Sequence, residues 1–533
     1  MNTWTERATL SGAWHHSVLR SPDAPFLVFE GPDGTATSWT FGEFDVVVAR
    51  AAEFLRRHGV GPGTSVHLAL TNSPAFVALW LAATGLRAWI VPSDPMGAAP
   101  ELSGHIDRTK PTAGFCATPR AAVYRAAVSN VGAADRMHIV EVDEGDCNLG
   151  LFGDRPLHQW PVTDAHDRAA VMFTSGTTGR PKGVEITQAN YAFAGATMAA
   201  AAGLTSRSRQ LVVLPLFHAN AQYYSIASAI WEGSSVALMH TFSASAFLSQ
   251  AARHGATHAS LFAAPIRMIL SRGATPVPGV RLQHCWYAMN ISDDQYQTLS
   301  GLLGCAPRQL YGMTETIPAV LTDSPEDTVP SSMGFMTEGC VVRVQRPDGT
   351  ETDSNEVGEI AVGGIPGITL FAGYLDDPET TMSSFQDGWF LTGDRARRDA
   401  NGRFFFDGRR ADVLKVAGEN VSTVEVEQVL AAHPGVLEAA VVGRPDPVRD
   451  EVPVGFVVAA DAAHPPTPQQ LHDWCAERLT KSKRPRDITF VDELPRTSVG
   501  KIRKFLLRDP TAESRPETPR PETPREVPKE VHV

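Results

Sequence analysis

Apolar positions in the first part of the chain alternate between helical and strand spacing. Between residues 41 and 58 they recur every three or four residues, and Gly59 ends the run, as expected for a helix. Residues 65–70 follow with the pattern of a strand, Ser73 can cap a further helix, and residues 88–91 have the pattern of the next strand. A strand, a helix and a strand at this spacing predict a parallel sheet with a crossover helix.

The same alternation returns further along the chain. Residues 211–214, 236–239 and 258–262 have the pattern of strands, and residues 221–231 have the pattern of a helix. The repetition predicts an α/β protein.

The pattern changes over residues 333–406. Short β-rich runs are separated there by Gly, Pro and Asp, without long helices, which predicts a small β-rich subdomain. A compact unit follows, with helical spacing over residues 424–431 and 469–479 and strand spacing over residues 437–442 and 455–458.

Two local features complete the pattern. Ser422 and Glu425 have the spacing of a capping box at the first helix of this last unit. Residues 510–533 contain RPETP twice in tandem and no hydrophobic periodicity, which predicts a disordered, Pro-rich tail.

Composition and charge narrow the classes of protein to consider. The chain has 533 residues, which at about 100–200 residues per domain corresponds to roughly three or four folding units. Hydrophobic residues make up 43% and charged residues 20%, which excludes a largely disordered chain. With 59 acidic and 47 basic residues the net charge is −12, which disfavours binding to nucleic acid.

The sequence also bears on location. The N-terminus carries Glu6 and Arg7 where a signal peptide needs an apolar core, and the most apolar stretch, residues 75–91, is interrupted by Gly85 and Arg87. The six cysteines are scattered and form no CxxC pair, as is typical of a reducing compartment. We therefore expect a cytoplasmic protein without a membrane span.

The segment VMFTSGTTGRPKGVEIT, residues 171–187, carries the most specific chemistry. An apolar strand leads directly into glycines and hydroxyl side chains, and a lysine follows. Glycines allow backbone N–H groups to converge on one point, and hydroxyls and lysine add donors and charge, so the segment predicts a grip for polyphosphate that is not a Walker loop. The candidate residues are Thr174, Ser175, Gly176, Thr177, Thr178 and Lys182.

This segment resembles the phosphate loop of the ANL superfamily, which comprises acyl-CoA synthetases, peptide synthetase adenylation domains and luciferases. The resemblance covers about residues 10–508. It implies an α/β fold with a large N-terminal domain over residues 1–408, built from two doubly wound sheets and the β-rich subdomain. It also implies a mobile α+β C-terminal domain over residues 409–509.

A second motif, YGMTET, is similar to the next signature of that family. Mg²⁺ bound with ATP needs hard oxygen ligands and usually one or two protein carboxylates, so Glu315 is the candidate metal ligand. The resemblance makes Thr314 a phosphate or acyl contact and Tyr311 a surface for adenine, with Gly312 and Met313 beside them.

Asp394 in LTGD, together with Arg409, resembles the ribose clamp of the family. A carboxylate accepts hydrogen bonds from both ribose hydroxyls, and a guanidinium reaches ribose or phosphate oxygens. Lys501 in PRTSVGK resembles the mobile lysine of the family, a cation placed between a reacting carboxylate and the α-phosphate of ATP.

The segment KVAGEN resembles the part of the family that lines the pantetheine tunnel for coenzyme A. Lys415, Gly418 and Glu419 are its candidate residues, and Gly418 leaves room for a thiol arm. The GEN form and the segment around Asn290 resemble the crotonobetaine/carnitine–CoA ligase branch. His218, in PLFHAN, occupies the position of a gate between acyl pocket and tunnel, where peptide synthetase domains carry an Asp.

Two positions depart from the family pattern. Ala411 stands where relatives commonly carry Asp or Lys as the hinge of domain rotation. Residues 288–291, with Asn290, replace the usual Gly-Ala-Ala-Pro segment beside adenine. Both departures touch nucleotide handling or the domain switch, and they leave open whether the adenylation step is retained.

The resemblance implies an AMP-forming acyl-CoA ligase that uses ATP, Mg²⁺ and coenzyme A to activate a small-molecule carboxylic acid. One alternative is a ligase specialised for the thioester half-reaction, which takes a preformed acyl-adenylate. Another is a stand-alone adenylation enzyme that loads a separate carrier protein. A luciferase-like oxidase and a non-enzymatic binding protein are further alternatives, and the assembly state, a monomer or a homodimer, stays open.

Overall fold

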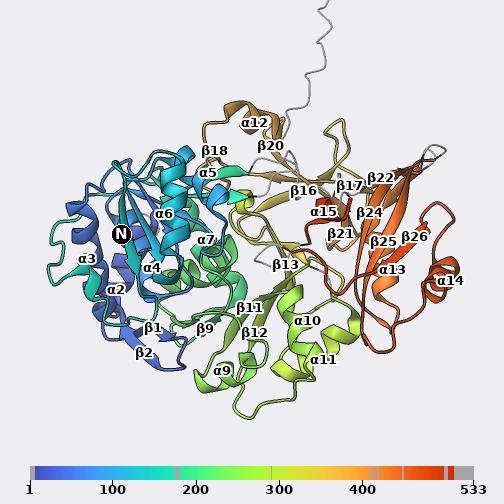
Figure 1. Ribbon diagram of the computed structural model, residues 1–533, viewed down its shortest axis with the longest axis horizontal. Coiled ribbons are helices and arrows are strands. Elements are labelled where there is room, and N and C mark those ends of the chain that lie inside the picture. The colour runs from blue at the N-terminus through green and yellow to red at the C-terminus, as the bar shows by residue number, and fades with distance from the viewer. Residues whose placement is uncertain are drawn as a thin grey trace, which may run out of the picture. The chain divides into compact units, whose positions relative to one another are not determined.

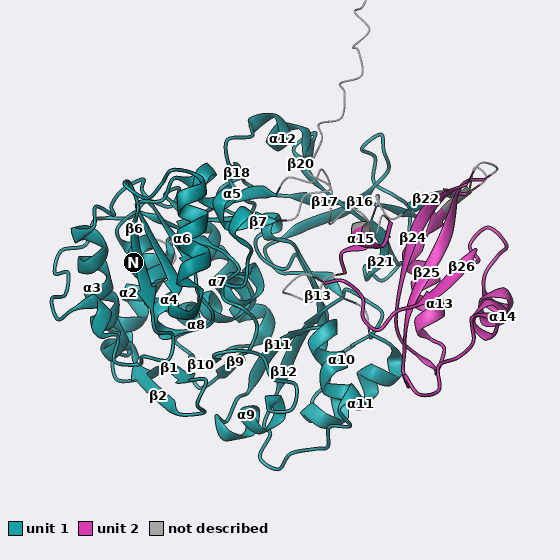
Figure 2. Ribbon diagram, viewed as in Figure 1, with its two compact units in different colours: residues 1–413, 498–501 teal, residues 414–497, 502–533 magenta. Residues whose placement is uncertain are grey.

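The computed structural model describes residues 7–174, 181–289, 291–409, 413–416, 419–446, 449–496 and 502–508. The chain forms two compact units, and the division falls between Val413 and Leu414 (Figure 2). Among the described residues, no helix is both long and apolar enough to cross a membrane.

Unit 1 contains a seven-stranded sheet with parallel strands and an antiparallel edge (Figure 1). Its strands, in spatial order, are β18 (Gly373–Tyr374), β8 (Lys182–Thr187), β7 (Arg168–Thr174), β4 (Trp89–Pro92), β3 (Ser65–Ala69), β5 (Ala113–Ala117) and β6 (His138–Val142). The helices that alternate with them are α3 (Phe41–Arg57), α4 (Pro74–Gly85), α5 (Ala99–Thr109) and α6 (Ala121–Asn130). Every residue of α4 is buried, which explains why its sequence is apolar on all sides.

A second, nine-stranded sheet completes the α/β part of unit 1. Its strands, in spatial order, are β15 (Phe335–Met336), β14 (Leu321–Thr322), β13 (Arg308–Tyr311), β12 (His284–Ala288), β11 (His258–Phe262), β9 (Arg209–Val212), β10 (Ser235–Met239), β1 (Pro25–Glu30) and β2 (Ala36–Thr40). Its helices are α2 (Leu10–Arg20), α7 (Gln188–Ala202), α9 (Phe247–Arg253), α10 (Ala263–Ser271) and α11 (Asp293–Leu303).

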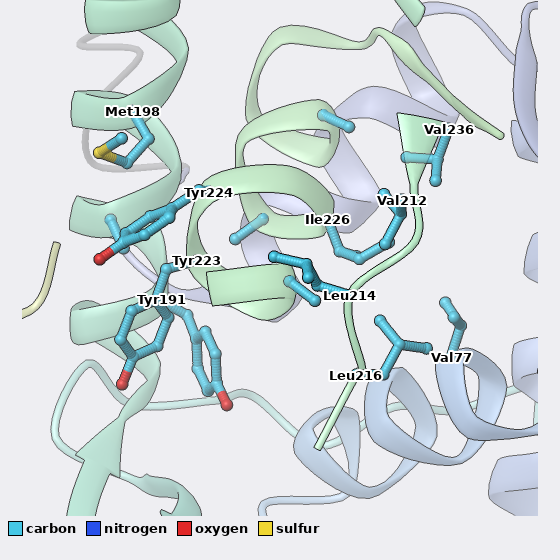
Figure 3. Packing of buried hydrophobic residues seen from close by; sticks show 14 of the residues in the cluster. Val77, Tyr191, Met198, Val212, Leu214, Leu216, Tyr223, Tyr224, Ile226 and Val236 are labelled. Atoms are coloured by element: carbon cyan, nitrogen blue, oxygen red, sulfur yellow. The ribbon is translucent and has the colours of Figure 1, made fainter. Parts of the chain in front are cut away.

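The helix expected over residues 221–231 has a different geometry from an ordinary α-helix. Residues Asn220–Ala227 form a π-helix, η3, and α8 (Ser228–Glu232) follows it directly. Side-chain spacing does not distinguish the two forms, and π segments are frequent at functional sites. Tyr223 and Tyr224 of η3 pack beside Tyr191 of α7 in the core (Figure 3).

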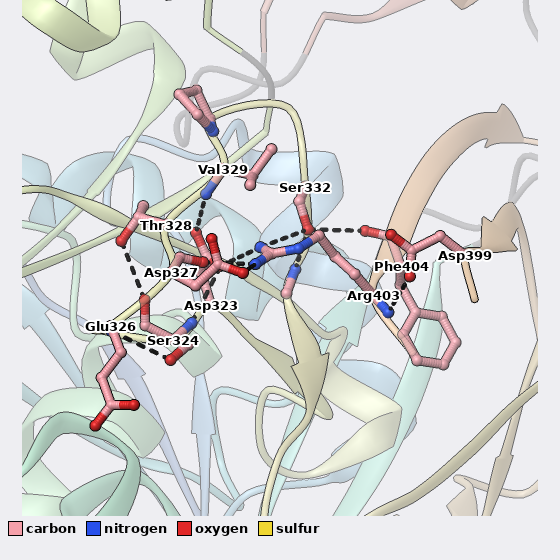
Figure 4. A network of polar contacts seen from close by, with 12 residues as sticks. Asp323, Ser324, Glu326, Asp327, Thr328, Val329, Ser332, Asp399, Arg403 and Phe404 are labelled. Carbon is pink, nitrogen blue, oxygen red and sulfur yellow. Dashed lines mark hydrogen bonds and ion pairs between the residues drawn. The ribbon is translucent and has the colours of Figure 1, made fainter. Parts of the chain in front are cut away.

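The β-rich region forms a five-stranded sheet of its own. Its strands are β16 (Val341–Gln345), β17 (Val357–Gly363), β19 (Phe385–Gln386), β20 (Trp389–Arg398) and β21 (Phe404–Arg409). Arg403, directly before β21, connects this strand to the segment that follows β14. It donates to Asp323 at 2.9 Å and to the Asp327 carboxylate at 2.6 Å (Figure 4). β15, which the sequence placed in this subdomain, pairs with β14 of the nine-stranded sheet instead.

Unit 2 is a smaller α+β unit. Its strands are β22 (Val413–Val416), which begins at the boundary, β23 (Glu419–Ser422), β24 (Val436–Asp446), β25 (Asp450–Ala459) and β26 (Asp487–Phe490), and its helices are α13 (Thr423–Ala431), α14 (Pro468–Arg478) and α15 (Lys504–Arg508). The predicted α/β class, with several sheets and a separate C-terminal unit, is confirmed.

The capping box expected at α13 is wrong. Ser422 is the residue before the helix, but its side chain makes no capping hydrogen bond. The Glu425 carboxylate accepts from Lys483 at 2.7 Å instead, because the fold brings a cation within its reach. Residues 510–533 lie outside the described residues, so their expected disorder stays a prediction.

Replacing Arg403 with Met should destabilise unit 1 by about 3–5 kcal/mol, because the buried Asp323 carboxyl would lose the cation that stabilises its charged form. The shift of the urea unfolding midpoint of unit 1 measures this. Arg398→Met is the matched control, since Arg398 pairs with Glu351 at the surface and such pairs contribute at most about 1 kcal/mol. Equal effects of the two substitutions would contradict the prediction.

Candidate functional site

The two described ends of the predicted phosphate loop face each other across an antiparallel strand pair. β7 ends at Thr174, β8 begins at Lys182, and these two residues are register partners. The other expected loop residues, Ser175, Gly176, Thr177 and Thr178, lie outside the described residues.

Tyr374, which the sequence analysis missed, connects this hairpin to the second motif. It pairs with Val184 in the third strand of the edge, β18, and its ring centre lies 4.6 Å from the Lys182 ammonium. Its hydroxyl donates to the Glu315 carboxylate at 3.1 Å. No motif in the sequence marks Tyr374, because only the pairing of β18 with β8 brings it to this place.

Glu315 lies in a short 3-10 helix, η4 (Thr314–Thr316), and is buried. Its backbone carbonyl accepts from the amide of Phe371 at 3.0 Å. Burial raises the pKa of the carboxyl, although its own backbone, Tyr374, Lys182 and Arg409 all act to lower it. A buried carboxylate with this limited compensation is well suited to accept a cation.

Asp394 brings the residues of two further motifs together. The Tyr311 hydroxyl donates to one oxygen of its carboxylate at 2.8 Å, and Arg409 Nε donates to the other at 2.8 Å. Asp394 and Arg409 are also register partners in β20 and β21. Burial and the neighbouring carboxylate raise the pKa of Tyr311, so its hydroxyl stays protonated and remains a donor.

The turn that carries the second motif is closely packed. A side chain on Gly312 would place its Cβ 2.8 Å from both Ala319 Cα and the Pro318 carbonyl, so this position requires glycine. The Met313 amide donates to the Thr316 hydroxyl at 3.0 Å, and the Thr314 carbonyl accepts from Tyr223 of η3 at 3.4 Å. Sequence reasoning missed Tyr223 as well; a helical pattern does not show which tyrosine faces the turn.

His218 and Asn220 stand where η3 begins. His218 Nε2 and Asn220 Nδ2 are buried and have no hydrogen-bond partner among the described residues, while Asn220 Oδ1 accepts from Ser260 at 2.9 Å. Burial lowers the pKa of His218 to about 4, against a smaller raising effect of Asp94, so the imidazole is neutral at pH 7.

The remaining candidates cannot be placed. Asn290, Gly418 and Lys501 lie outside the described residues, as does Ala411. Lys415 and Glu419 belong to strands β22 and β23 of unit 2, but their side chains lie outside what the structure describes.

The described part of the chain holds no group of three or more His, Cys, Asp or Glu side chains that could bind a metal ion. Glu315 therefore stands as a single carboxylate rather than as part of a protein-made cage. A single carboxylate fits Mg²⁺, which commonly takes its other ligands from water and substrate phosphates.

Residues 14–375 match the family described as AMP-binding enzyme, and residues 425–501 match the AMP-binding enzyme C-terminal domain. The chain belongs to the AMP-binding enzyme family. Crotonobetaine/carnitine–CoA ligase from Salmonella arizonae is 31% identical over 505 residues, which cover 91% of this chain and 96% of that protein. The resemblance to the ANL superfamily and to this branch is thereby confirmed.

Solved structures of related enzymes have the same fold as this chain. MatB from Rhodopseudomonas palustris with bound ATP has a TM-score of 0.84 and 26% identity, over 95% of this chain and 99% of that chain. The o-succinylbenzoate coenzyme A synthetase MenE from Bacillus subtilis, in complex with AMP, has a TM-score of 0.81 and 27% identity, over 93% and 98% of the two chains. The predicted reaction class, an AMP-forming acid–thiol ligase that binds ATP or AMP, is confirmed at this level.

Replacing His218 with Gln should make the protein more resistant to acid. A histidine whose pKa is about 4 when folded and 6.5 when unfolded releases its proton on folding, so stability falls as pH drops from 6.5 toward 4. His218→Gln should therefore raise the free energy of unfolding by about 2 kcal/mol more at pH 5 than at pH 8, relative to wild type. Thermal unfolding of wild type, His218→Gln and the exposed control His158→Gln across this range measures the effect. A control that behaves like His218→Gln would contradict this cause.

Proposed function

We propose that this enzyme joins a carboxylic acid to coenzyme A in two steps at one site. The acid first attacks the α-phosphate of ATP to give an acyl-adenylate and pyrophosphate. The thiol of coenzyme A then attacks the acyl carbon and releases AMP. The observation that carries this proposal is the convergence of Lys182, Tyr374 and Glu315 near the Tyr311–Asp394–Arg409 group.

Different residues of the site would bind different parts of the nucleotide. Thr174, Lys182 and the loop between them would hold the β- and γ-phosphates, and the buried carboxylate of Asp394 with Arg409 would hold the ribose. Glu315 would hold Mg²⁺, which screens the phosphate charges when bound. Tyr311 donates to Asp394, so it orients this carboxylate in addition to offering its ring to adenine.

The C-terminal domain expected over residues 409–509 would supply the groups that differ between the two steps. We assign to Lys501 the stabilisation of charge on the α-phosphate and carboxylate during adenylation. Gly418, with Lys415 and Glu419, would line the path of the thiol arm in the second step. This assignment requires the C-terminal domain expected over residues 409–509 to move between the steps.

The two alternatives make different demands on the same site. A thioester-only ligase, suggested by Ala411 and the segment around Asn290, would lack ATP–pyrophosphate exchange but form thioester from synthetic acyl-adenylate. A stand-alone adenylation enzyme would show exchange but transfer the acyl group only to a carrier protein. The intact geometry at Glu315 and Asp394 favours the full cycle.

The buried nitrogens at the start of η3 bear on the acid. His218 Nε2 and Asn220 Nδ2 lack partners, and buried polar groups are normally satisfied. We infer an acyl group that brings a hydrogen-bonding atom, as o-succinylbenzoate in the name of the Bacillus relative does. We also propose a cytoplasmic location, where the six free cysteines would stay reduced.

Replacing Glu315 with Gln should slow adenylation by about 10²–10³-fold, because the metal that screens the phosphates loses its carboxylate ligand. Thioester formation from supplied acyl-adenylate should change only slightly, since no pyrophosphate leaves in that step. Pyrophosphate exchange and thioester formation measure the two halves. Unchanged exchange would exclude Glu315 as the metal ligand.

Replacing Lys501 with Ala should lower pyrophosphate exchange by about 10²–10³-fold and spare thioester formation, because the cation acts on the α-phosphate only during adenylation. Lys481, an exposed lysine of the same expected domain, residues 409–509, provides the control Lys481→Ala, which should leave both half-reactions unchanged. Equal damage to both half-reactions in Lys501→Ala would contradict the division of labour.

A further inference from the structure

Arg108 lies near the end of α5, in a segment that belongs to none of the motifs above. Among the described residues, its guanidinium contacts three places at the loop end of the β7–β8 hairpin. Nη1 donates to the carbonyl of Pro181 at 2.5 Å, and Nη2 donates to the carbonyl of Leu375 at 3.3 Å. The guanidinium carbon lies 5.0 Å from the centre of the Phe173 ring.

These three contacts lie beside the two described ends of the predicted phosphate loop. Phe173 directly precedes Thr174, and Pro181 directly precedes Lys182. Leu375 follows β18, the third strand of this edge. One planar guanidinium therefore joins the chain before the loop, the chain after it and the strand beside it.

The loop end of the hairpin is closely packed. The Leu375 amide donates to the Gly183 carbonyl at 2.7 Å. A Cβ on Gly183 would lie 3.1 Å from both Leu375 Cβ and Val171 Cγ1 and 3.2 Å from the Phe173 ring. In a region packed this closely, a displaced strand end moves the loop that it carries.

α5 contributes a second contact from the same face of the helix. His105, three residues before Arg108, stacks on Phe173 with ring centres 4.1 Å apart and an angle of 4° between the planes. Its Nδ1 is hydrogen-bonded to the Ser93 hydroxyl at 2.8 Å, which connects it to the buried His67. The Phe173 ring is thus in contact with both His105 and Arg108.

We propose that Arg108 is a positioning residue for Thr174 and Lys182, the two described ends of the predicted phosphate loop, and sets where these residues meet the β- and γ-phosphates of ATP. The proposal rests on the proposed function of the loop. A guanidinium fork can hold two carbonyls and an aromatic ring at once, whereas an ammonium on a flexible stem cannot. Arg108 touches neither nucleotide nor acid and acts through Thr174 and Lys182.

The test compares two nucleotides that differ only in these phosphates. Isothermal titration calorimetry with Mg²⁺ and ATP, and separately with AMP, is carried out on wild type, Arg108→Ala and Arg108→Lys. Arg108→Ala should raise the Kd for ATP roughly tenfold and leave the Kd for AMP within about twofold. Arg108→Lys should fall between wild type and Arg108→Ala for ATP.

Arg125→Ala is the matched control, because Arg125 lies on the neighbouring helix α6 and pairs at the surface with Glu141. It should leave both affinities unchanged. Equal weakening of ATP and AMP by Arg108→Ala, or an unchanged Kd for ATP, would overturn the proposal. If Arg108→Ala fails to fold, Arg108→Lys decides by the same comparison.

The result is separable from the proposed function. A wild-type protein that forms no acyl-adenylate, but whose ATP affinity still depends on Arg108, would refute the ligase cycle and retain the positioning role. An active ligase whose ATP affinity does not change in Arg108→Ala would support the ligase cycle and refute the positioning role.

Discussion

The buried carboxylate of Glu315 is the group on which the candidate site depends. Burying a carboxylate is unfavourable unless hydrogen bonds or cations compensate it. Here the Tyr374 hydroxyl binds it directly, and the charges of Lys182 and Arg409 act on it from further away. The partial compensation leaves the carboxylate suited to a divalent cation that arrives with a nucleotide.

The strands and turns around Glu315 hold its carboxylate and its hydrogen-bond partner in place. β18 pairs with β8 and thereby places Tyr374 beside Lys182. The amide of Phe371, just before β18, binds the backbone carbonyl of Glu315 itself. One short segment of chain thus links the edge of the seven-stranded sheet to the turn between β13 and β14 of the nine-stranded sheet.

Asp394 plays the corresponding role for the third sheet. Its two carboxylate oxygens are bound by Tyr311 at the end of β13 and by Arg409 at the end of β21. Residues from two sheets are therefore held by one buried anion, with short charge-assisted hydrogen bonds. Since Tyr311 lies four positions before Glu315, one segment of chain carries both the Glu315 carboxylate and a hydrogen-bond donor to the Asp394 carboxylate.

The sequence by itself determined the fold class and most candidate residues. Alternating apolar periods located the strands and helices of the α/β part, and the TSGTTG, YGMTET and LTGD segments marked Thr174, Glu315 and Asp394. Periodicity and motifs are local properties, so they can be seen along the chain. The π geometry of η3 and the ion pair of Glu425 depend on the packing around them. Side-chain spacing predicted an ordinary helix where η3 lies, and it predicted a capping box for Glu425, which binds Lys483 instead.

Only the tertiary structure decided which side chains meet. Tyr374 and Arg108 carry no motif, and they become neighbours of the β7–β8 hairpin through strand pairing and helix packing across long separations. The buried nitrogens of His218 and Asn220 likewise appear only once the surrounding groups are placed. The physical reason is that hydrogen-bond satisfaction and burial are properties of a spatial environment, to which residues distant in sequence contribute.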